Sequence, residues 1–296
     1  MSDPSNDAAV DHSETCCASF LEWLATHGAD TSRIEWPCFT WPGLPHDGVR
    51  GVAASALIDA GDVMFKIPGS LLIDRRTCLA SDIGSIFLDN PSLFSSLDEV
   101  ALSLFIAYET FCKGSSSFWW PFIQNLPRSP GATLFPLFDH AFDFGQLFDC
   151  CICSRPLCCC HSTDVLAGST ISWSDSELVF LQDSELAQST RALLSKIQKV
   201  FKAQIQPLQQ QYRPKLDGID FTRFLWSYVC VGSRTFGRFL PYPSLVPFAD
   251  MLNHVNVHTT YRWDGTHAVY FNDTRTPAVA GSELCFSCVM APCVQV

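Results

Sequence analysis

Residues 245–254, with the sequence Leu-Val-Pro-Phe-Ala-Asp-Met-Leu-Asn-His, are the stretch whose residue types most clearly indicate chemistry. An apolar run that ends in Asn253 and His254 delivers two polar side chains to one point, because polar groups in such a setting need partners. A buried strand or helix that ends in a capping asparagine is also consistent with this sequence. The residues on either side of the stretch favour the functional interpretation.

Short motifs flank this stretch in a fixed order. Gly-Val-Arg-Gly-Val-Ala-Ala occupies residues 48–54, Ser-Phe-Trp-Trp-Pro-Phe 117–122, Trp-Ser-Tyr 226–228 and Gly-Ser-Arg-Thr-Phe 232–236. This order resembles the SET-domain lysine methyltransferases, specifically the subfamily related to Rubisco large-subunit methyltransferase. The resemblance runs in pieces from about residue 20 to residue 286. Each motif is weak alone, whereas several in one order are a strong signal.

The resemblance implies an α+β fold, a SET domain of short twisted β-sheets with a helical insertion. We expect a disordered N-terminus at 1–18, where the composition is polar and acidic. The SET domain is expected at 19–289, with the helical insertion at about 81–228 and an irregular cysteine-rich stretch at 138–169. Residues 290–296 would then be an aberrant tail of a C-terminally truncated chain.

Local patterns predict several elements in more detail. Apolar residues at helical spacing predict a helix beginning near Phe20, and 63–67 and 71–73 are predicted strands, the first stopped by Pro68. Ser174 and Glu177 have the spacing of a helix capping box. The apolar face at 193–205 predicts a helix ending at Pro207, and 221–236 predicts another. Residues 261–271 predict a hairpin that turns at Asp-Gly.

The resemblance also assigns binding roles, with S-adenosyl-L-methionine as the cofactor. The matching cofactor-binding positions are Asp47, Gly48, Val49, Arg234, Asn253 and His254. The positions that match the substrate side are Arg234, Arg238, Asp250 and Tyr261. Simpler interpretations exist, since a glycine turn at a strand end is common without a ligand. Arg234 and Asp250 could form an ordinary ion pair, and Tyr261 could be a strand aromatic.

Methyl transfer to lysine makes specific demands on such a site. A free lysine has a pKa of about 10.4, so desolvation or neighbouring groups must lower it before the amine can attack. The acceptor nitrogen must also be held in line behind the methyl group, and positioning supplies much of the remaining rate. The implied partner is therefore a protein substrate bearing a lysine.

The chain departs from the family pattern at its end. The pattern expects Tyr-Gly shortly after the strand that follows Gly281, and the alignment places Cys288 and Val289 there. A thiol is a weak hydrogen-bond donor and does not replace a phenol that orients the acceptor amine. No catalytic residue is thus intact, and weak or absent turnover is expected. The alternatives are a catalytically impaired module that binds cofactor or peptide, and a protein-histidine methyltransferase.

Composition limits the remaining function classes. The chain has 296 residues, 47% of them hydrophobic, which is ample for a packed core. A formal net charge of −11 argues against nucleic-acid binding and suits a basic partner or simply solubility. The N-terminus lacks secretory-signal features and no apolar stretch reaches bilayer length. We expect an intracellular monomer, cytoplasmic or nuclear with an organelle left open, and no membrane partner.

Cysteine is unusually frequent, with 15 residues in the chain. Without a secretory signal, mostly reduced thiols are expected. The cluster within 138–169 has ligand types that could hold zinc, but its spacing does not match a two-plus-two finger, so no metal is predicted. We interpret this segment instead as an insertion absent from the subfamily, from a retained intron or a gene-model error, because a family-like pattern resumes at residue 171.

Overall fold

The computed structural model describes residues 7–38, 51–95, 97–127, 170–182, 184–237, 239–254, 257–265, 267–273 and 275–286. The α-helices are α1 (Asp7–Thr26), α2 (Arg75–Ala80), α3 (Gly84–Asp89), α4 (Glu99–Tyr108), α5 (Trp120–Ile123), α7 (Asp175–Leu178), α8 (Glu185–Val200), α9 (Gln206–Gln211) and α10 (Phe221–Arg234). The 3₁₀ turns are η1 (Gly69–Leu71), η2 (Pro91–Leu93), η4 (Gly114–Ser116), η6 (Thr170–Ser172), η7 (Val179–Leu181) and η9 (Ala249–Met251), and the π-helical turns are η3 (Glu109–Lys113) and η8 (Phe201–Ile205). The strands are β1 (Ile34–Glu35), β2 (Val52–Ala54), β3 (Phe65–Pro68), β4 (Thr235–Phe236), β5 (Ser244–Leu245), β6 (Asn253–His254), β7 (Thr259–Trp263), β8 (Ala268–Asp273) and β9 (Glu283–Phe286).

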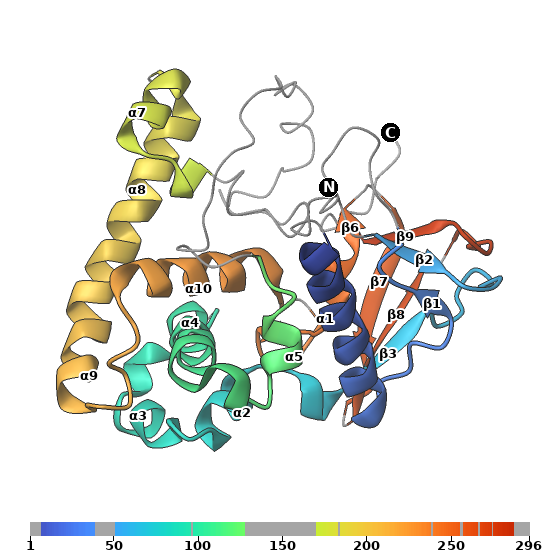
Figure 1. Cartoon of the computed structure of the whole chain (residues 1–296), viewed down its shortest axis with the longest axis horizontal. Helices are drawn as coiled ribbons and strands as arrows, with labels where there is room; N and C mark the ends of the chain where they lie inside the picture. The colour runs from blue at the N-terminus through green and yellow to red at the C-terminus, as the bar shows by residue number, and fades with distance from the viewer. Residues whose placement is uncertain are drawn as a thin grey trace, which may run out of the picture.

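The strands form three small sheets on one side of the molecule (Figure 1). Their orders are β1-β2-β9-β6, β3-β8-β7 and β4-β5. Neighbouring strands are antiparallel except β6 and β9, which run parallel. A parallel contact requires the chain to cross over before it returns, and here the β7–β8 hairpin lies within that crossover. The predicted mixture of helices and short sheets is confirmed.

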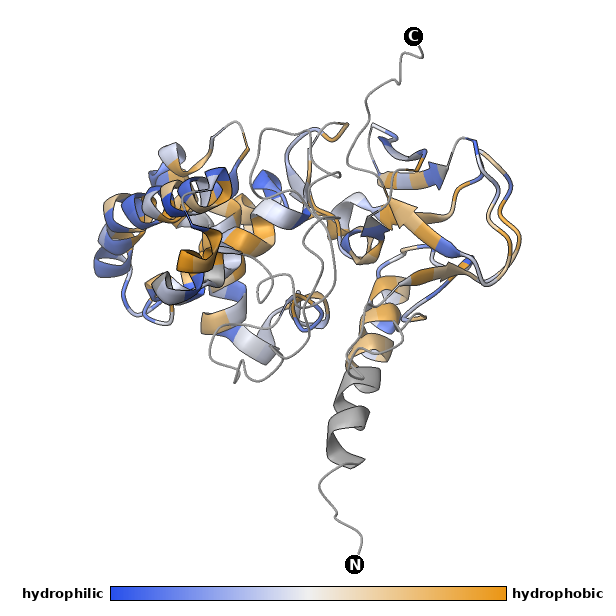
Figure 2. Ribbon diagram, turned by 90° about the horizontal axis from the view of Figure 1, so that it is seen from above, coloured by the Kyte–Doolittle hydropathy of each residue, from blue (hydrophilic) through white to orange (hydrophobic). Residues whose placement is uncertain are grey.

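The helices of the middle of the chain gather on the other side of the molecule (Figure 1). Helix α4 lies against α10, and eight of the ten residues of α4 are buried, so it forms the centre of this half. Helix α1 packs beside the strands and contacts α5. One hydrophobic core runs through both halves, from Phe20 of α1 to Phe286 of β9. The outer helices are mainly polar where they face away from that core (Figure 2).

Three local predictions are confirmed. The helix predicted at 221–236 is α10, and the hairpin predicted at 261–271 is β7–β8. Gly265 in that turn has φ +95°, a conformation that glycine adopts at little cost. The capping box forms as expected: the Glu177 carboxylate accepts from the Ser174 backbone N–H at 2.6 Å, and the Glu177 N–H donates to Ser174 Oγ at 3.3 Å.

Two predictions of element ends differ from the structure. Helix α1 begins at Asp7, within the N-terminal residues predicted to be disordered, because a helix anchored by a packed segment extends at low cost through helix-forming alanines. The helical segment predicted to end at Pro207 continues into α9. Proline is tolerated there because it lies in the first turn after the π-helical turn η8, where the regular hydrogen-bond register is already interrupted.

The strand predicted at 71–73 is also wrong. Leu71 belongs to the 3₁₀ turn η1, and Ile73 makes only an isolated bridge to Leu245. Leu71, Leu72 and Ile73 are all buried, so the run shows no alternation that would separate a strand from an irregular core segment. Across the described helices, none is long and apolar enough to cross a membrane.

Candidate functional site

The stretch at 245–254 folds as a short strand, a sharp turn and a second short strand. Phe248 lies at the turn with φ 78° and ψ −40°, a backbone conformation that bulky residues rarely adopt. Its side chain is fully buried, and its ring lies 5.3 Å from the ring of Phe65 and 6.1 Å from that of Trp36. Such strain persists only where packing enforces it and is frequent at functional sites. The turn carries Asp250 in η9 and then Asn253 in β6.

Arg234, the last residue of α10, is paired with Asp250. Arg234 Nη1 donates to Asp250 Oδ2 at 2.9 Å and to the Asp250 carbonyl at 3.0 Å. The two side chains are only 9% and 3% exposed. Burial raises the pKa of Asp250, and the nearby Arg234 guanidinium opposes this shift without cancelling it. Desolvation therefore outweighs the attraction within this pair.

The Arg234–Asp250 pair is only partly satisfied. Counting partners among the described residues, neither Arg234 Nε nor Asp250 Oδ1 has a hydrogen bond. Buried polar atoms of this kind are uncommon, because each costs the free energy of its lost hydration. One donor and one acceptor of this buried pair thus lack a hydrogen bond within the described part of the chain.

Strand β6 places the Asn-His pair next to β9. Asn253 is opposite Cys285 and His254 opposite Phe286 in the parallel register. Asn253 Nδ2 donates to the Glu283 carboxylate at 2.6 Å, which fixes the orientation of the amide. Burial raises the pKa of Cys285 to about 11, so this neighbour is an uncharged thiol at neutral pH. The backbone of His254 is described, and its side chain lies outside the described residues.

Five rings form an aromatic cluster beside these strands. The aromatic cluster comprises Phe236, Phe239, Tyr261, Phe271 and Phe286. Tyr261 is its centre, with ring centroids of Phe236, Phe239 and Phe271 at 5.4, 5.5 and 5.6 Å. Phe239 is 43% exposed and forms the outer edge. An amine that enters such an apolar surface loses hydration, which lowers its pKa.

The chain itself connects the cluster to the polar groups. Phe236 follows Arg234 by two residues and its ring lies 5.5 Å from that of Phe286. Phe286 in turn is the register partner of His254. The Arg234–Asp250 pair, β6 and the aromatic cluster are therefore neighbours, although they come from distant parts of the sequence.

The predicted site residues have different outcomes. The structure brings Arg234 and Asp250 into contact, places Asn253 and His254 on β6 and puts Tyr261 in the aromatic cluster. The simpler interpretations also fit, since Arg234 and Asp250 do form an ion pair and Tyr261 is on a strand. Outside the described residues lie Asp47, Gly48, Val49, Arg238, Cys288 and the cysteine-rich stretch 138–169. The ligand roles of all these residues stay predictions.

Sequence reasoning did not select Glu283 or the aromatic partners of Tyr261. Glu283 matters because it holds the Asn253 amide. The sequence pattern that could have identified Glu283 is the alternation of a short strand at 283–286. In such a strand the side chains of Glu283 and Leu284 lie on opposite faces. As to metals, among the described residues there is no group of three or more His, Cys, Asp or Glu that could hold an ion.

Comparisons with known proteins bear on the origin of this site. No family model matches the sequence. The chain is 24% identical over 242 residues to [fructose-bisphosphate aldolase]-lysine N-methyltransferase, chloroplastic, of Arabidopsis thaliana, covering 80% of this chain and 39% of the relative. It is also 24% identical over 239 residues to the ribulose-1,5 bisphosphate carboxylase/oxygenase large subunit N-methyltransferase, chloroplastic, of Nicotiana tabacum, covering 80% and 38%. The chain thus spans about two-fifths of the length of these relatives.

Solved structures give the same result for the fold. A crystal structure of the SET domain of LSMT bound to lysine and AdoHcy aligns with a TM-score of 0.63 at 20% identity, covering 94% of this chain and 54% of that one. Because the alignment covers 94% of this chain, it includes residues of both the helical half and the small sheets. The predicted resemblance is confirmed: the chain has the SET-domain fold and is a homologue of the lysine methyltransferases related to the Rubisco large-subunit enzyme.

Proposed function

We propose that this chain binds S-adenosylmethionine and is a protein-lysine N-methyltransferase by descent, with weak or absent turnover in the present sequence. The observation that carries the proposal is the buried Arg234–Asp250 pair, in which Arg234 Nε and Asp250 Oδ1 have no hydrogen-bond partner among the described residues. Homology supports the reaction class, because the relatives are named as lysine N-methyltransferases.

The polar groups of the site fit the cofactor. When bound, S-adenosylmethionine supplies a methyl group on a sulfonium, together with an amino-acid end that carries one carboxylate and one ammonium. Arg234 Nε is a donor suited to a carboxylate, and a charge-assisted hydrogen bond of this kind is stronger than a neutral one. Asn253 can orient a ligand because its own amide is held by Glu283. Asp47, Gly48, Val49 and His254 complete the proposed cofactor set by resemblance.

The same site offers suitable surroundings for a lysine. Desolvation by the aromatic cluster lowers the pKa of an entering amine, which raises the fraction of the amine that is uncharged and able to attack. Arg234, Arg238, Asp250 and Tyr261 form the proposed substrate side. A net charge of −11 favours a basic substrate segment.

Cys288 is the reason for the proposed weak turnover. With tritium-labelled S-adenosylmethionine, we expect the unchanged chain to give labelling at background level and Cys288→Tyr to give measurable labelling, because the phenol restores a hydrogen-bonding group beside the amine. Fructose-bisphosphate aldolase and the Rubisco large subunit, the proteins that appear in the relatives' names, are the first acceptors to use. Cys293→Tyr is the matched control, since it makes the same change elsewhere in the C-terminal segment.

The outcomes of this experiment separate the candidate functions. Strong labelling by the unchanged chain would contradict the role given to Cys288. Methyllysine in the hydrolysed product supports the lysine assignment, whereas methylhistidine would replace it with the histidine alternative. Cofactor binding without labelling by either chain would favour the second candidate function, a binding module without turnover. The cysteine at position 288 is the sequence feature that favours this candidate over an intact enzyme.

We also propose that the protein is a monomer in an intracellular compartment and that it has no nucleic-acid or membrane partner. The relatives are both named as chloroplastic, so an organelle remains within the proposal.

A further inference from the structure

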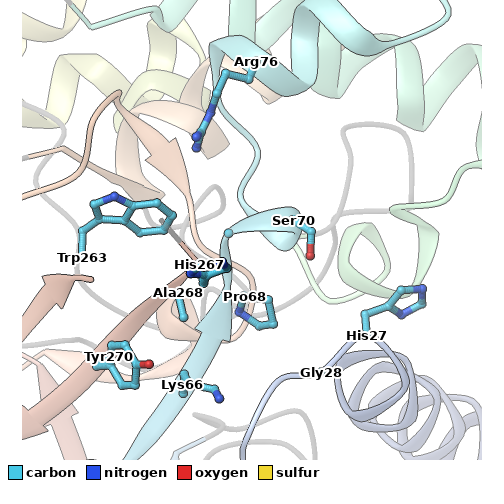
Figure 3. Close-up of a pocket in the computed structure, with 11 residues that line it drawn as sticks. His27, Gly28, Lys66, Pro68, Ser70, Arg76, Trp263, His267, Ala268 and Tyr270 are labelled. Atoms are coloured by element: carbon cyan, nitrogen blue, oxygen red, sulfur yellow. The ribbon is translucent and has the colours of Figure 1, made fainter. Parts of the chain in front are cut away.

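A pocket of about 540 Å³ lies between the end of α1, the β3–η1 segment, α2 and the β7–β8 hairpin (Figure 3). This volume is in the range of small-molecule sites, about 300–1,000 Å³. The residues of its lining that bear charge, titrate or carry rings are His27, Lys66, Arg76, Trp263, His267 and Tyr270. None of the candidate site residues that the structure describes belongs to the lining.

The pocket has the opposite charge character to the chain. The protein has 30 acidic and 19 basic residues, yet the described residues of the lining include Lys66, Arg76 and two histidines and no Asp or Glu. Figure 3 shows Arg76 and Lys66 at opposite ends of the pocket, with His267 between them. A positively charged side chain in a concave surface raises the local concentration of anions.

Arg76 is held in a fixed position at one end. Its Nε and Nη2 donate to the buried carboxylate of Asp74, and its guanidinium lies 5.9 Å from the ring centre of Trp263. Within the described part of the chain, Nη1 has no hydrogen-bond partner and remains for a ligand. Because Asp74 neutralises the charge of Arg76, this end of the pocket contributes a hydrogen-bond donor in a fixed position and little net positive charge.

Lys66 supplies the excess charge at the other end. It forms no ion pair with a described residue. Asp30 is its partner in an isolated antiparallel bridge, and the Asp30 pKa is lowered mainly by hydrogen bonds from Ser32 and to a lesser extent by the charge of Lys66. Lys66 is directly opposite Tyr270 in the β3–β8 register, so both side chains are on one face of the sheet. In Figure 3 the Tyr270 hydroxyl is on the side of Lys66, and the Lys66 side chain extends away from Tyr270. An ammonium and a phenol together can hold one phosphate or carboxylate group.

The wall between the two ends is closely packed. A Cβ on Gly69 would lie 2.7 Å from Cη2 of Trp263, so the absence of a side chain at position 69 allows the indole to lie against the backbone. The Gly69 N–H also donates to the carbonyl of His267, which ties η1 to the hairpin. These two contacts connect η1 with the hairpin between the two ends of the pocket, and such preorganisation favours binding.

We propose that this pocket binds a small polyanion, a molecule with two or more phosphate or carboxylate groups. One anionic group is held by Lys66 and the Tyr270 hydroxyl, and a second by Nη1 of Arg76. The proposal does not depend on methyl transfer, and it is tested by binding alone.

The test is calorimetric titration of the full chain with pyrophosphate and with citrate at constant ionic strength, which separates phosphate from carboxylate ligands. Inorganic phosphate and acetate serve as comparators with a single anionic group. We expect pyrophosphate or citrate to bind at least tenfold more tightly than its comparator. Lys66→Gln should weaken that binding at least tenfold, and it breaks no ion pair with a described residue, so the variant is expected to fold.

Lys199→Gln is the matched control, because it removes the same charge from an exposed position on α8 and should leave binding unchanged. Tyr270→Phe removes only the hydroxyl and should weaken binding by a smaller factor. Absence of saturable binding for both polyanions would overturn the proposal, as would equal losses in Lys66→Gln and Lys199→Gln.

Discussion

Replacing Asp250 by alanine is expected to lower the free energy of unfolding by about 3–5 kcal/mol, because the variant leaves the Arg234 guanidinium buried without its counter-charge. Arg234 is only 9% exposed and cannot recover its hydration without moving out of the site. Burial already raises the pKa of Asp250, so the intact pair contributes little net stability while its one-sided removal is costly. Urea denaturation followed by circular dichroism measures the change.

Asp62→Ala is the matched control for this variant. The Arg33–Asp62 pair has the same 2.9 Å separation between nitrogen and oxygen, but its side chains are 46% and 50% exposed. An exposed pair contributes about 0–1 kcal/mol, so this loss should be small. Equal effects of the two alanine substitutions would show that the Arg234–Asp250 pair is not buried in solution.

Phe271→Ala is expected to destabilise the protein by about 3–5 kcal/mol, because it leaves a cavity in a fully buried region. The Phe271 ring stacks on Phe65 with centroids 4.5 Å apart and also contacts Tyr261. Its side chain has no exposed surface, so the cavity cannot be filled by solvent without further cost. The same change removes support from the aromatic cluster, and Tyr261 should lose its fixed orientation.

Phe180→Ala provides the comparison, since Phe180 is 82% exposed in η7. Surface substitutions of this kind change stability by about 0.5 kcal/mol or less. Thermal and urea denaturation of both variants give the two values. A loss in Phe180→Ala as large as that in Phe271→Ala would contradict the described core.

The sequence correctly predicted the elements that depend on contacts between residues close together in the chain. The β7–β8 hairpin follows from alternating apolar residues around Asp264-Gly265, and the capping box from the Ser174–Glu177 spacing. Helix α10 follows from its apolar periodicity. The positions of the cofactor and the catalytic departure at Cys288 came from the resemblance, because no local pattern specifies a ligand.

The features that escaped prediction depend on contacts between distant residues. Ile73 forms a bridge with Leu245, and the Asn253 amide donates to Glu283. Local sequence patterns predict neither partner, because both are distant in the sequence. The positive φ of Phe248 has no local signature, since bulky residues usually avoid it and packing alone enforces it here. The polyanion pocket likewise exists only once α1, α2 and the hairpin are assembled.

The central claim is that the Arg234–Asp250 pair, Asn253 on β6 and the residues assigned by resemblance form a cofactor site. Calorimetric titration of the purified chain with S-adenosylmethionine tests it most directly. We expect saturable binding near one equivalent per chain, weakened at least tenfold in Asn253→Ala and unchanged in Asn272→Ala, which removes an amide from β8. Absence of binding by a chain that circular dichroism shows to be folded would contradict the account.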